Sequence, residues 1–198
     1  VFAWTAVVVV LSFLLERLFL FFFRKLRDWQ PFLAGKEQEY PAEDVKVCGL
    51  FRGYDGKQVL RDVNAHYRKG KIYCLMAPSG AGKTTLLLTM AGIYPPEKGS
   101  ISGCRYPSVL FQEDRLLPKA TVLQNAAVAA GEEKARNILS DLGLSDVFLQ
   151  KTEELSGGMK RRVCLARALA YGGDCLLLDE PFTGLDAVSY THLTLPTT

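Results

Sequence analysis

Three stretches of the chain combine polar groups with spacings that suit phosphate chemistry. Residues 77–85 read APSGAGKTT, residues 175–181 read CLLLDEP and residues 155–162 read LSGGMKRR. The first places two glycines, a lysine and two threonines between apolar runs, and the second ends a run of leucines with two acids. The third places a serine and two glycines before a helical pattern. Together they offer donors to an anion, oxygen ligands to a cation and a carboxylate that can act on water.

Residues 77–85 fit the phosphate-binding loop pattern G-x-x-x-x-G-K-[ST], with Ala77 in place of the first glycine. We expect a strand to end at Ala77 and a helix to begin near Lys83, so that the helix dipole favours an anion at the loop. The backbone N–H groups that turn toward a phosphate belong to Ser79, Gly80, Ala81 and Gly82. A purely structural glycine turn is the alternative, and the strand–loop–helix context argues against it.

The side chains that follow have separate roles in this interpretation. Lys83 can reach the β- and γ-phosphate oxygens, Thr84 can bind Mg²⁺ and Thr85 can donate to a phosphate. Alanine at position 77 has less access to positive φ than glycine, which alters the loop geometry but leaves the N–H donors in place.

The acidic pair Asp179 and Glu180 ends the apolar run of CLLLDEP. At the end of a strand beside the loop, Asp179 can hold Mg²⁺ directly or through water. Glu180, one residue later, can polarise an attacking water. The alternative is an exposed acidic pair before a proline turn, but four apolar residues followed by two acids is an unusual end for a buried strand.

Ser156, Gly157 and Gly158 form a second helix start with N–H groups available to an anion. Within one chain this second anion site would be redundant. If two copies pair head to tail, each nucleotide is held by the loop of one copy and the serine–glycine segment of the other.

Hydrophobic periodicity and turn residues predict the elements that position these groups. The predicted strands cover 45–54, 57–67, 71–77, 109–112 and the apolar part of 175–181, and the predicted helices cover 83–92, 121–142 and 156–170. A turn at Asp55-Gly56 joins the first two strands. The strands at 71–77 and 175–181 are expected to be buried.

The N-terminal segment has a different character from the rest of the chain. Residues 1–23 carry only two charges, and a helix of that length spans roughly 34 Å, enough to cross a hydrocarbon core. Basic residues follow immediately and place that end on the cytoplasmic side. We expect a transmembrane helix and its flank at 1–29 and a linker at 30–44. A signal peptide or a buried soluble helix is the alternative.

Composition limits the remaining possibilities. The net charge is only +3 and the basic residues form no long run, so nucleic acid is not an expected partner. None of the five cysteines has a metal-like spacing, and buried or surface thiols in a reducing compartment are expected. Residues 188–198 resemble the translation of a sequencing-library adapter, so we expect an artefact there and no functional role for His192. A natural polar tail is the alternative.

The combination of APSGAGKTT, LSGGMKRR and CLLLDEP resembles the ATP-binding cassette (ABC) transporter family over residues 45–187. The resemblance implies an α/β fold of the P-loop NTPase class. That fold has a mostly parallel sheet, an antiparallel subdomain and a helical subdomain, which is short here. It also implies ATP and Mg²⁺ as ligands, and a nucleotide-binding domain that is incomplete at its C-terminal end, with the family's switch histidine beyond Asp186.

The resemblance also implies roles for single residues. Tyr54 would stack on adenine, and Gln112 would sense Mg²⁺ and the γ-phosphate while touching the membrane subunit. Asp186 would communicate across a dimer, and Ser156, Gly157 and Gly158 would bind the ATP of the partner copy.

The implied partners are a second nucleotide-binding domain in a head-to-tail dimer, a transmembrane permease domain and, for an importer, an extracytoplasmic solute-binding protein. FQEDRLLP and TVLQNA are similar to importers for nitrate, sulfonates and taurine, which favours a permease–ATPase fusion that imports a small solute across the cytoplasmic membrane. An exporter half-transporter is the alternative. A non-transport ATPase and a nucleotide-binding remnant without hydrolysis remain open as well.

Overall fold

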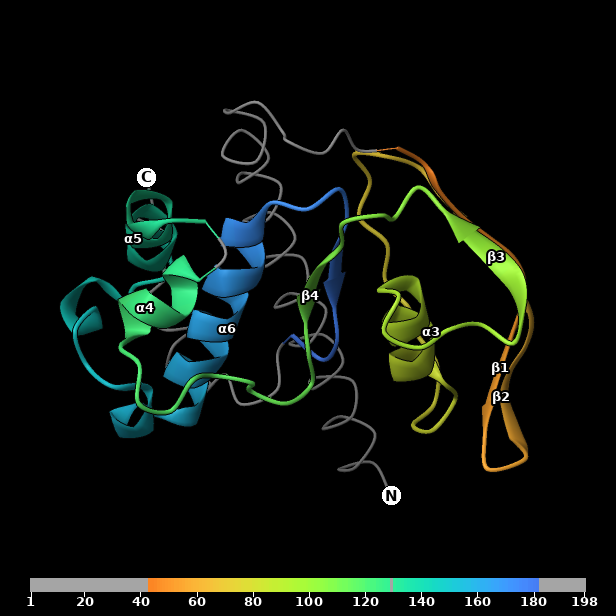
Figure 1. The fold of residues 1–198 in the computed structure, drawn as a ribbon, viewed down its shortest axis with the longest axis horizontal. Helices are drawn as coiled ribbons and strands as arrows, with labels where there is room; N and C mark the ends of the chain where they lie inside the picture. The colour runs from red at the N-terminus through yellow and green to blue at the C-terminus, as the bar shows by residue number, and fades with distance from the viewer. Residues whose placement is uncertain (1–42, 129, 182–198) are drawn as a thin grey trace, which may run out of the picture. The chain divides into compact units, whose positions relative to one another are not determined.

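The computed structural model describes residues 43–128 and 130–181, and the element labels are those of Figure 1. The strands are β1 (Val45–Tyr54), β2 (Lys57–Tyr67), β3 (Lys98–Ser102), β4 (Ser108–Leu110) and β5 (Leu176–Leu178). The helices are α3 (Lys83–Met90), α4 (Val122–Ala127), α5 (Glu132–Asp141) and α6 (Gly157–Tyr171), with short 3₁₀ turns η1 (Ser145–Val147) and η2 (Thr152–Glu154).

Several predictions fall on residues that the structure does not describe. These are the transmembrane segment at 1–29, most of the linker at 30–44, Asp186 and the tail at 188–198. Within the described residues, no helix is both long enough and apolar enough to cross a membrane.

Strands β1, β2 and β3 form an antiparallel sheet in the order β2-β1-β3. The predicted turn between β1 and β2 is confirmed, with φ of 48° at Asp55 and 77° at Gly56, the left-handed values that a tight hairpin needs. Strand β3 was not predicted, because KGSIS contains a single large apolar residue. The sheet corresponds to the expected antiparallel subdomain.

Strands β4 and β5 pair in parallel, with Ser108 opposite Leu176 and Leu110 opposite Leu178. They form a separate sheet of two strands, so the parallel part of the described residues is smaller than the mostly parallel sheet that we expected. The expectation of a fully buried strand is wrong for β5, since Leu177 is buried but Leu176 and Leu178 are only half-buried.

The predicted buried strand at 71–77 is also wrong. These residues adopt no regular structure and are exposed, Met76 at 89%. Tyr73 is held locally instead: its hydroxyl accepts from the Arg68 N–H at 2.9 Å, and its ring lies edge-on to Tyr67 with centroids 5.1 Å apart. An apolar run alone does not show whether a strand partner exists, which is why the pattern misled the prediction.

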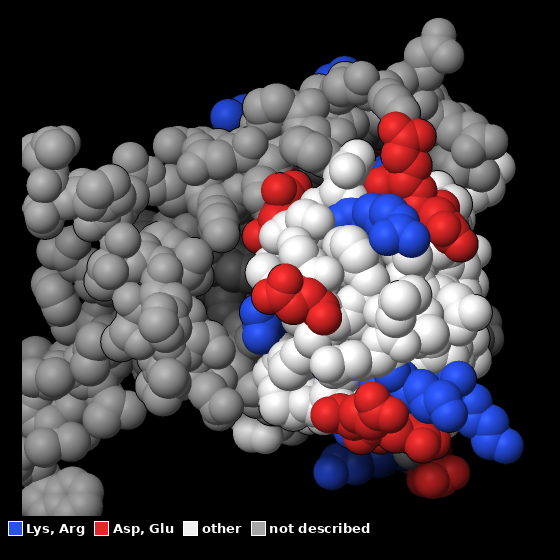
Figure 2. Space-filling model, turned by 90° about the vertical axis from the view of Figure 1, so that its left-hand side faces the viewer, with Lys and Arg blue, Asp and Glu red and all other residues white. Residues whose placement is uncertain are grey.

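Helices α4, α5 and α6 contact one another and form the expected helical part, labelled together in Figure 1. The single helix predicted at 121–142 is two helices, because α5 begins again after Gly131 at φ 77°. Thr121 and Gln124 close a capping box at the start of α4. On the side of the molecule shown in Figure 2, acidic and basic side chains lie next to one another around a mostly uncharged area, so their fields offset each other.

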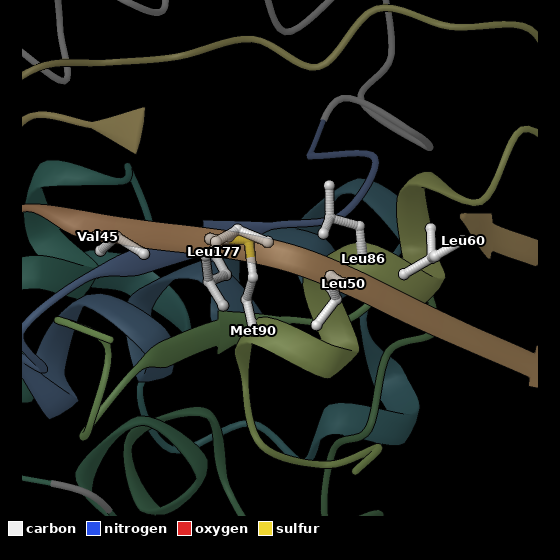
Figure 3. Close-up of a cluster of buried hydrophobic side chains, with 7 residues drawn as sticks. Val45, Leu50, Leu60, Leu86, Met90 and Leu177 are labelled. Atoms are coloured by element: carbon white, nitrogen blue, oxygen red, sulfur yellow. The ribbon is translucent and has the colours of Figure 1, made fainter. Parts of the chain in front are cut away.

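A cluster of buried side chains connects the two sheets through α3 (Figure 3). It consists of Val45, Val47 and Leu50 from β1, Leu60 from β2, Leu86 and Met90 from α3, and Leu177 from β5. Apolar burial of this kind is the main stabilising term in folding. The helix that follows the glycine-rich loop is therefore held against both the hairpin and the strand that precedes the acidic pair.

The expectation that all cysteines are thiols is wrong for one pair. Cys104 and Cys175 form a disulfide across 71 residues of sequence, whereas Cys48, Cys74 and Cys164 are free. Sequence spacing could not reveal this pair, because the fold alone brings the two segments together.

Candidate functional site

The glycine-rich loop ends at Gly82, which caps α3 with φ 92°. A side chain at this position would be strained, and its Cβ would lie 2.8 Å from Cγ1 of Val59 in β2. Gly80 also has a positive φ, of 78°, and the Ala81 N–H donates to the Pro78 carbonyl at 3.2 Å. The loop is thus a tight turn that leads into a helix near Lys83, as the sequence predicts.

Lys83 folds back over the loop. Its Nζ donates to the carbonyl oxygens of Ala77 at 2.8 Å and Pro78 at 2.9 Å. Ser79, Gly80 and Ala81 are exposed, while Thr84 and Thr85 are half-buried in the first turn of α3. A bound anion would offer the ammonium group stronger, charge-assisted partners than these two carbonyls.

The acidic pair lies where the two parallel strands end. Asp179 is 6% exposed and its N–H donates to the Leu110 carbonyl at 2.9 Å, which extends the ladder of β4 and β5 by one residue. The Gln112 amide donates from Nε2 to Oε2 of Glu180 at 3.4 Å. The structure therefore brings Gln112 next to Asp179 and Glu180, although at least 67 positions separate it from them in sequence. The three residues meet at the strand ends where α/β proteins bind ligands.

Glu180 has a backbone φ of 46°, in the left-handed region that a glutamate rarely adopts. A residue in this region costs on the order of 1 kcal/mol or more, and such strain persists where the surroundings hold it. At Glu180 the surroundings include a guanidinium group from α6.

That guanidinium belongs to Arg161, which is 3% exposed. Its Nη1 donates to the carbonyls of Phe111 and Gln112, which follow β4. Its Nη2 donates to the carbonyls of Asp179 and Glu180, which follow β5. One side chain of the LSGGMKRR segment thereby fixes the backbone at both strand ends.

Sequence reasoning missed Arg161, although a signal was present. Arg161 lies three positions before Cys164 and four before Leu165. At the helical period, these spacings put all three residues on one face. All three are buried in α6. A charged residue on an apolar helix face requires a set of partners, and that requirement could have drawn attention to it.

Ser156 caps α6, its Oγ accepting from the Met159 N–H at 3.3 Å. Ser156 and Gly157 are exposed and Gly158 is half-buried, and a Cβ placed on Gly157 would meet no atom within 4 Å. The main contacts of α6 are with β4, α4 and α5. This helix start is therefore open to a group outside the chain, as the head-to-tail interpretation requires.

Tyr54 lies at the end of β1, half-buried, and packs edge-on against Tyr94 with ring centroids 5.5 Å apart. The guanidinium carbon of Arg52 is 4.9 Å from the centre of the Tyr54 ring and 5.6 Å from that of Tyr94. This aromatic and cationic group can take a planar base by stacking.

Three of the predicted residues provide oxygen atoms suited to Mg²⁺: the hydroxyl of Thr84, the amide of Gln112 and the carboxylate of Asp179. Mg²⁺ prefers such oxygen ligands together with substrate phosphates and water. The burial of Asp179 at the end of β5 fits this role, because a buried carboxylate needs a compensating partner.

The profile of the ABC transporter family matches residues 60–183, which is more than half of the chain. The chain belongs to the ABC transporter family. It is 43% identical over 149 residues to an aliphatic sulfonates import ATP-binding protein of Paraburkholderia xenovorans, covering 73% of this chain and 60% of that protein.

Other relatives agree with this placement. A protein of the same name from Frankia alni is 41% identical over 153 residues, covering 75% of this chain and 62% of its own length. The structure of a putative ABC transporter ATP-binding protein from Pyrococcus furiosus superposes with a TM-score of 0.67 at 28% identity, covering 75% of this chain and 81% of that one. The ABC-type P-loop fold is thereby established, and the chain spans about three fifths of the length of the curated relatives.

Proposed function

We propose that this chain carries the ATP-binding and ATP-hydrolysing domain of an ABC importer for a small solute. The observation that supports hydrolysis best is the contact of Gln112 with Glu180 beside the buried Asp179, at the ends of two paired strands. Asp179 and Glu180 directly follow strand β5, whose Leu177 belongs to the same buried cluster as Leu86 of α3, the helix after the glycine-rich loop.

In this proposal, each site residue acts on ATP in a distinct way. The loop from Ser79 to Gly82 donates its N–H groups to the phosphates, and Lys83 exchanges its two carbonyl partners for phosphate oxygens. Thr85 donates to a phosphate, and Tyr54 stacks on the base. Glu180 accepts a hydrogen bond from the attacking water and aligns it with the γ-phosphate.

Thr84, Gln112 and Asp179 would hold Mg²⁺, which when bound neutralises charge on the phosphates. The Gln112 amide, already in contact with Glu180, links the water-activating carboxylate to these oxygen ligands. A change at either residue would then alter both the metal ligands and the position of the water.

The open start of α6 supports a second copy as partner. Ser156, Gly157 and Gly158 would bind the nucleotide held by the opposite copy, and Asp186 would communicate across that dimer. We further propose a permease domain, which includes the segment at 1–29, and a cytoplasmic position of the nucleotide-binding domain at the inner membrane. The names of the relatives suggest an aliphatic sulfonate as the solute. An extracytoplasmic solute-binding protein would deliver it, as the resemblance to importers implies.

The test compares Glu180→Gln with Lys83→Ala in the full-length gene product. We expect Glu180→Gln to bind ATP as the parent does but to hydrolyse it on the order of 100-fold more slowly, because the water loses its base. Lys83→Ala, the matched control, should lose ATP affinity instead. Nucleotide binding by fluorescence and phosphate release measure the two properties separately, and unchanged turnover in Glu180→Gln would refute the assignment.

A further inference from the structure

Three side chains with metal-binding atoms converge next to β5, away from the residues assigned to ATP. Cys104 lies between β3 and β4, and Asp174 and Cys175 immediately precede β5. One ligand atom from each of the three lies within 4.8 Å of the others, and all three residues are half-buried. The two sulfur atoms form a disulfide in this structure, which describes the oxidised state of the pair.

The carboxylate of Asp174 is held in a fixed orientation with one oxygen left over. Its Oδ2 accepts from the backbone N–H groups of Arg105 at 2.6 Å and Tyr106 at 3.0 Å. Its Oδ1 is buried and has no hydrogen-bond partner among the residues that the structure describes. A buried carboxylate oxygen without a partner is costly, and in a native fold it calls for a ligand, an ion or a water.

The backbone keeps the two segments in place whatever the state of the sulfurs. The Ser108 N–H donates to the Cys175 carbonyl at 2.8 Å, and the Asp174 N–H donates to the Tyr106 carbonyl at 3.1 Å. The Gly173 N–H donates to the Ser108 hydroxyl at 3.0 Å. With their Cα atoms 6.0 Å apart, the two cysteines can therefore remain side by side after the disulfide is reduced.

We propose that, when the disulfide is reduced, Cys104, Cys175 and Asp174 bind a thiophilic divalent cation, with Zn²⁺ as the ion. Two thiolates and a carboxylate supply three ligands of the tetrahedral set that Zn²⁺ takes, and water supplies the fourth. Thiolate sulfur selects Zn²⁺ over Mg²⁺ and Ca²⁺, which prefer oxygen. The ion gives the left-over oxygen of Asp174 the partner that the disulfide does not provide.

Reduction of the Cys104–Cys175 disulfide requires a thiol reductant of the kind found in a reducing cytoplasm. Two electrons from the reductant break the S–S bond, the protein gains two thiols, and the reductant is oxidised to its own disulfide. Binding of the cation then displaces the two thiol protons into solution. The site is thus available to a metal only in the reduced protein.

The first test is a titration of the full chain, reduced with a phosphine and freed of metal, with Co²⁺ as a coloured substitute for Zn²⁺. We expect a sulfur-to-cobalt charge-transfer band that saturates at about one ion per chain and disappears when Zn²⁺ is added. Cys104→Ser and Cys175→Ser should abolish the band, and Asp174→Asn should weaken binding about tenfold or more. The matched control is the double variant Cys48→Ser, Cys74→Ser, which removes the exposed thiols and should bind as the parent does.

A second measurement needs no variant, so it tests the proposed Zn²⁺ site even if a substitution prevents folding. The reduced chain is alkylated with and without Zn²⁺, and the modified cysteines are mapped by mass spectrometry. We expect Zn²⁺ to slow the alkylation of Cys104 and Cys175 at least tenfold and to leave Cys48 and Cys74 unchanged. Equal alkylation in both samples, or a disulfide that resists the phosphine, would overturn the proposal. Neither outcome depends on ATP hydrolysis, so the proposed function stands or fails separately.

Discussion

At the scale of single residues, the guanidinium group of Arg161 leads to the strongest prediction, which concerns the rate of ATP hydrolysis. It donates to four backbone carbonyls, two after β4 and two after β5. Arg161→Lys keeps the charge but replaces a planar fork with one ammonium group, which cannot span both strand ends. We expect kcat for ATP to fall at least tenfold in Arg161→Lys while ATP affinity changes little, because Gln112 and Glu180 lose their fixed positions but the phosphate-binding loop does not.

Steady-state kinetics and direct ATP binding, measured on the full-length gene product, check this split. The control is Arg136→Lys, since Arg136 is exposed and forms two surface contacts, an ion pair with Glu132 at 3.7 Å and a cation–π contact 5.4 Å from the centre of the Phe148 ring. An equal loss of affinity and turnover in Arg161→Lys would indicate a general structural role, and normal turnover would contradict the positioning role.

The buried thiol of Cys164 leads to a prediction about how the stability of the protein depends on pH. Burial, followed by the neighbouring charge of Asp114, raises the pKa of its thiol to about 12 from the ordinary 9.0. In the unfolded chain the thiol loses its proton near its ordinary pKa, whereas the folded chain keeps it. The stability that the protonated thiol contributes is therefore complete below pH 9 and is lost as the pH rises toward 12.

Urea unfolding of the parent and of Cys164→Ala, at about pH 8 and about pH 10.5, measures this effect. We expect the parent to lose more free energy of unfolding between the two values than the variant does, because the variant lacks the titrating thiol. The same loss in both proteins would show that other groups account for the alkaline destabilisation.

At the scale of elements, Asn125 fixes the segment 117–121, which leads into α4. It is fully buried in α4; its Oδ1 accepts from the Leu117 N–H at 2.7 Å, and its Nδ2 donates to the carbonyls of Leu117, Ala120 and Thr121. Asn125→Leu would leave the Leu117 N–H without its partner, whereas the carbonyls of Leu117, Ala120 and Thr121 keep other donors. We expect a loss of about 1–3 kcal/mol in the free energy of unfolding.

Thermal and urea unfolding measure that loss. Asn137→Ala is the matched control, because Asn137 lies on the exposed face of α5 and its change should stay within about 0.5 kcal/mol. A similar small effect for Asn125→Leu would mean that water replaces the missing partners.

The elements also show what the sequence could reveal. Local signals were sufficient for the β1–β2 hairpin, for α3 after its glycine-rich loop and for α6 after its serine cap, because turns and caps depend on neighbouring residues. They failed for 71–77, where strand formation depends on a partner elsewhere in the fold. They also failed for Arg161 and for the pair Cys104 and Cys175, whose partners lie 18 to 71 positions away.

For the whole molecule, the exposed segment 71–77 predicts a cleavage site. Lys71 precedes five residues without regular structure, all of them exposed, immediately before the glycine-rich loop. We expect trypsin to cut the nucleotide-free chain first at this lysine, because a protease needs an extended and accessible backbone. Addition of ATP should slow the cut by ordering the adjoining loop.

Mass spectrometry of the first fragments checks the site. Lys134 and Arg136 are exposed as well but lie within α5, so they serve as internal controls that should be cut later. Cleavage in α5 before Lys71 would show that the segment is protected in solution.

The pairing of β4 with β5 has a consequence for how the protein acquires its activity during synthesis. Ser108 lies opposite Leu176, so nearly seventy residues must emerge from the ribosome between the two strands, whereas the β1–β2 hairpin closes over a two-residue turn. Non-local pairings of this kind form slowly, after local ones. The hairpin, α3 and the glycine-rich loop can therefore assemble early, before Glu180, the residue that we propose to activate water, is in place. If the proposed function is correct, a nascent chain would pass through a stage that binds nucleotide without hydrolysing it, and the pairing of β5 with β4 would end that stage.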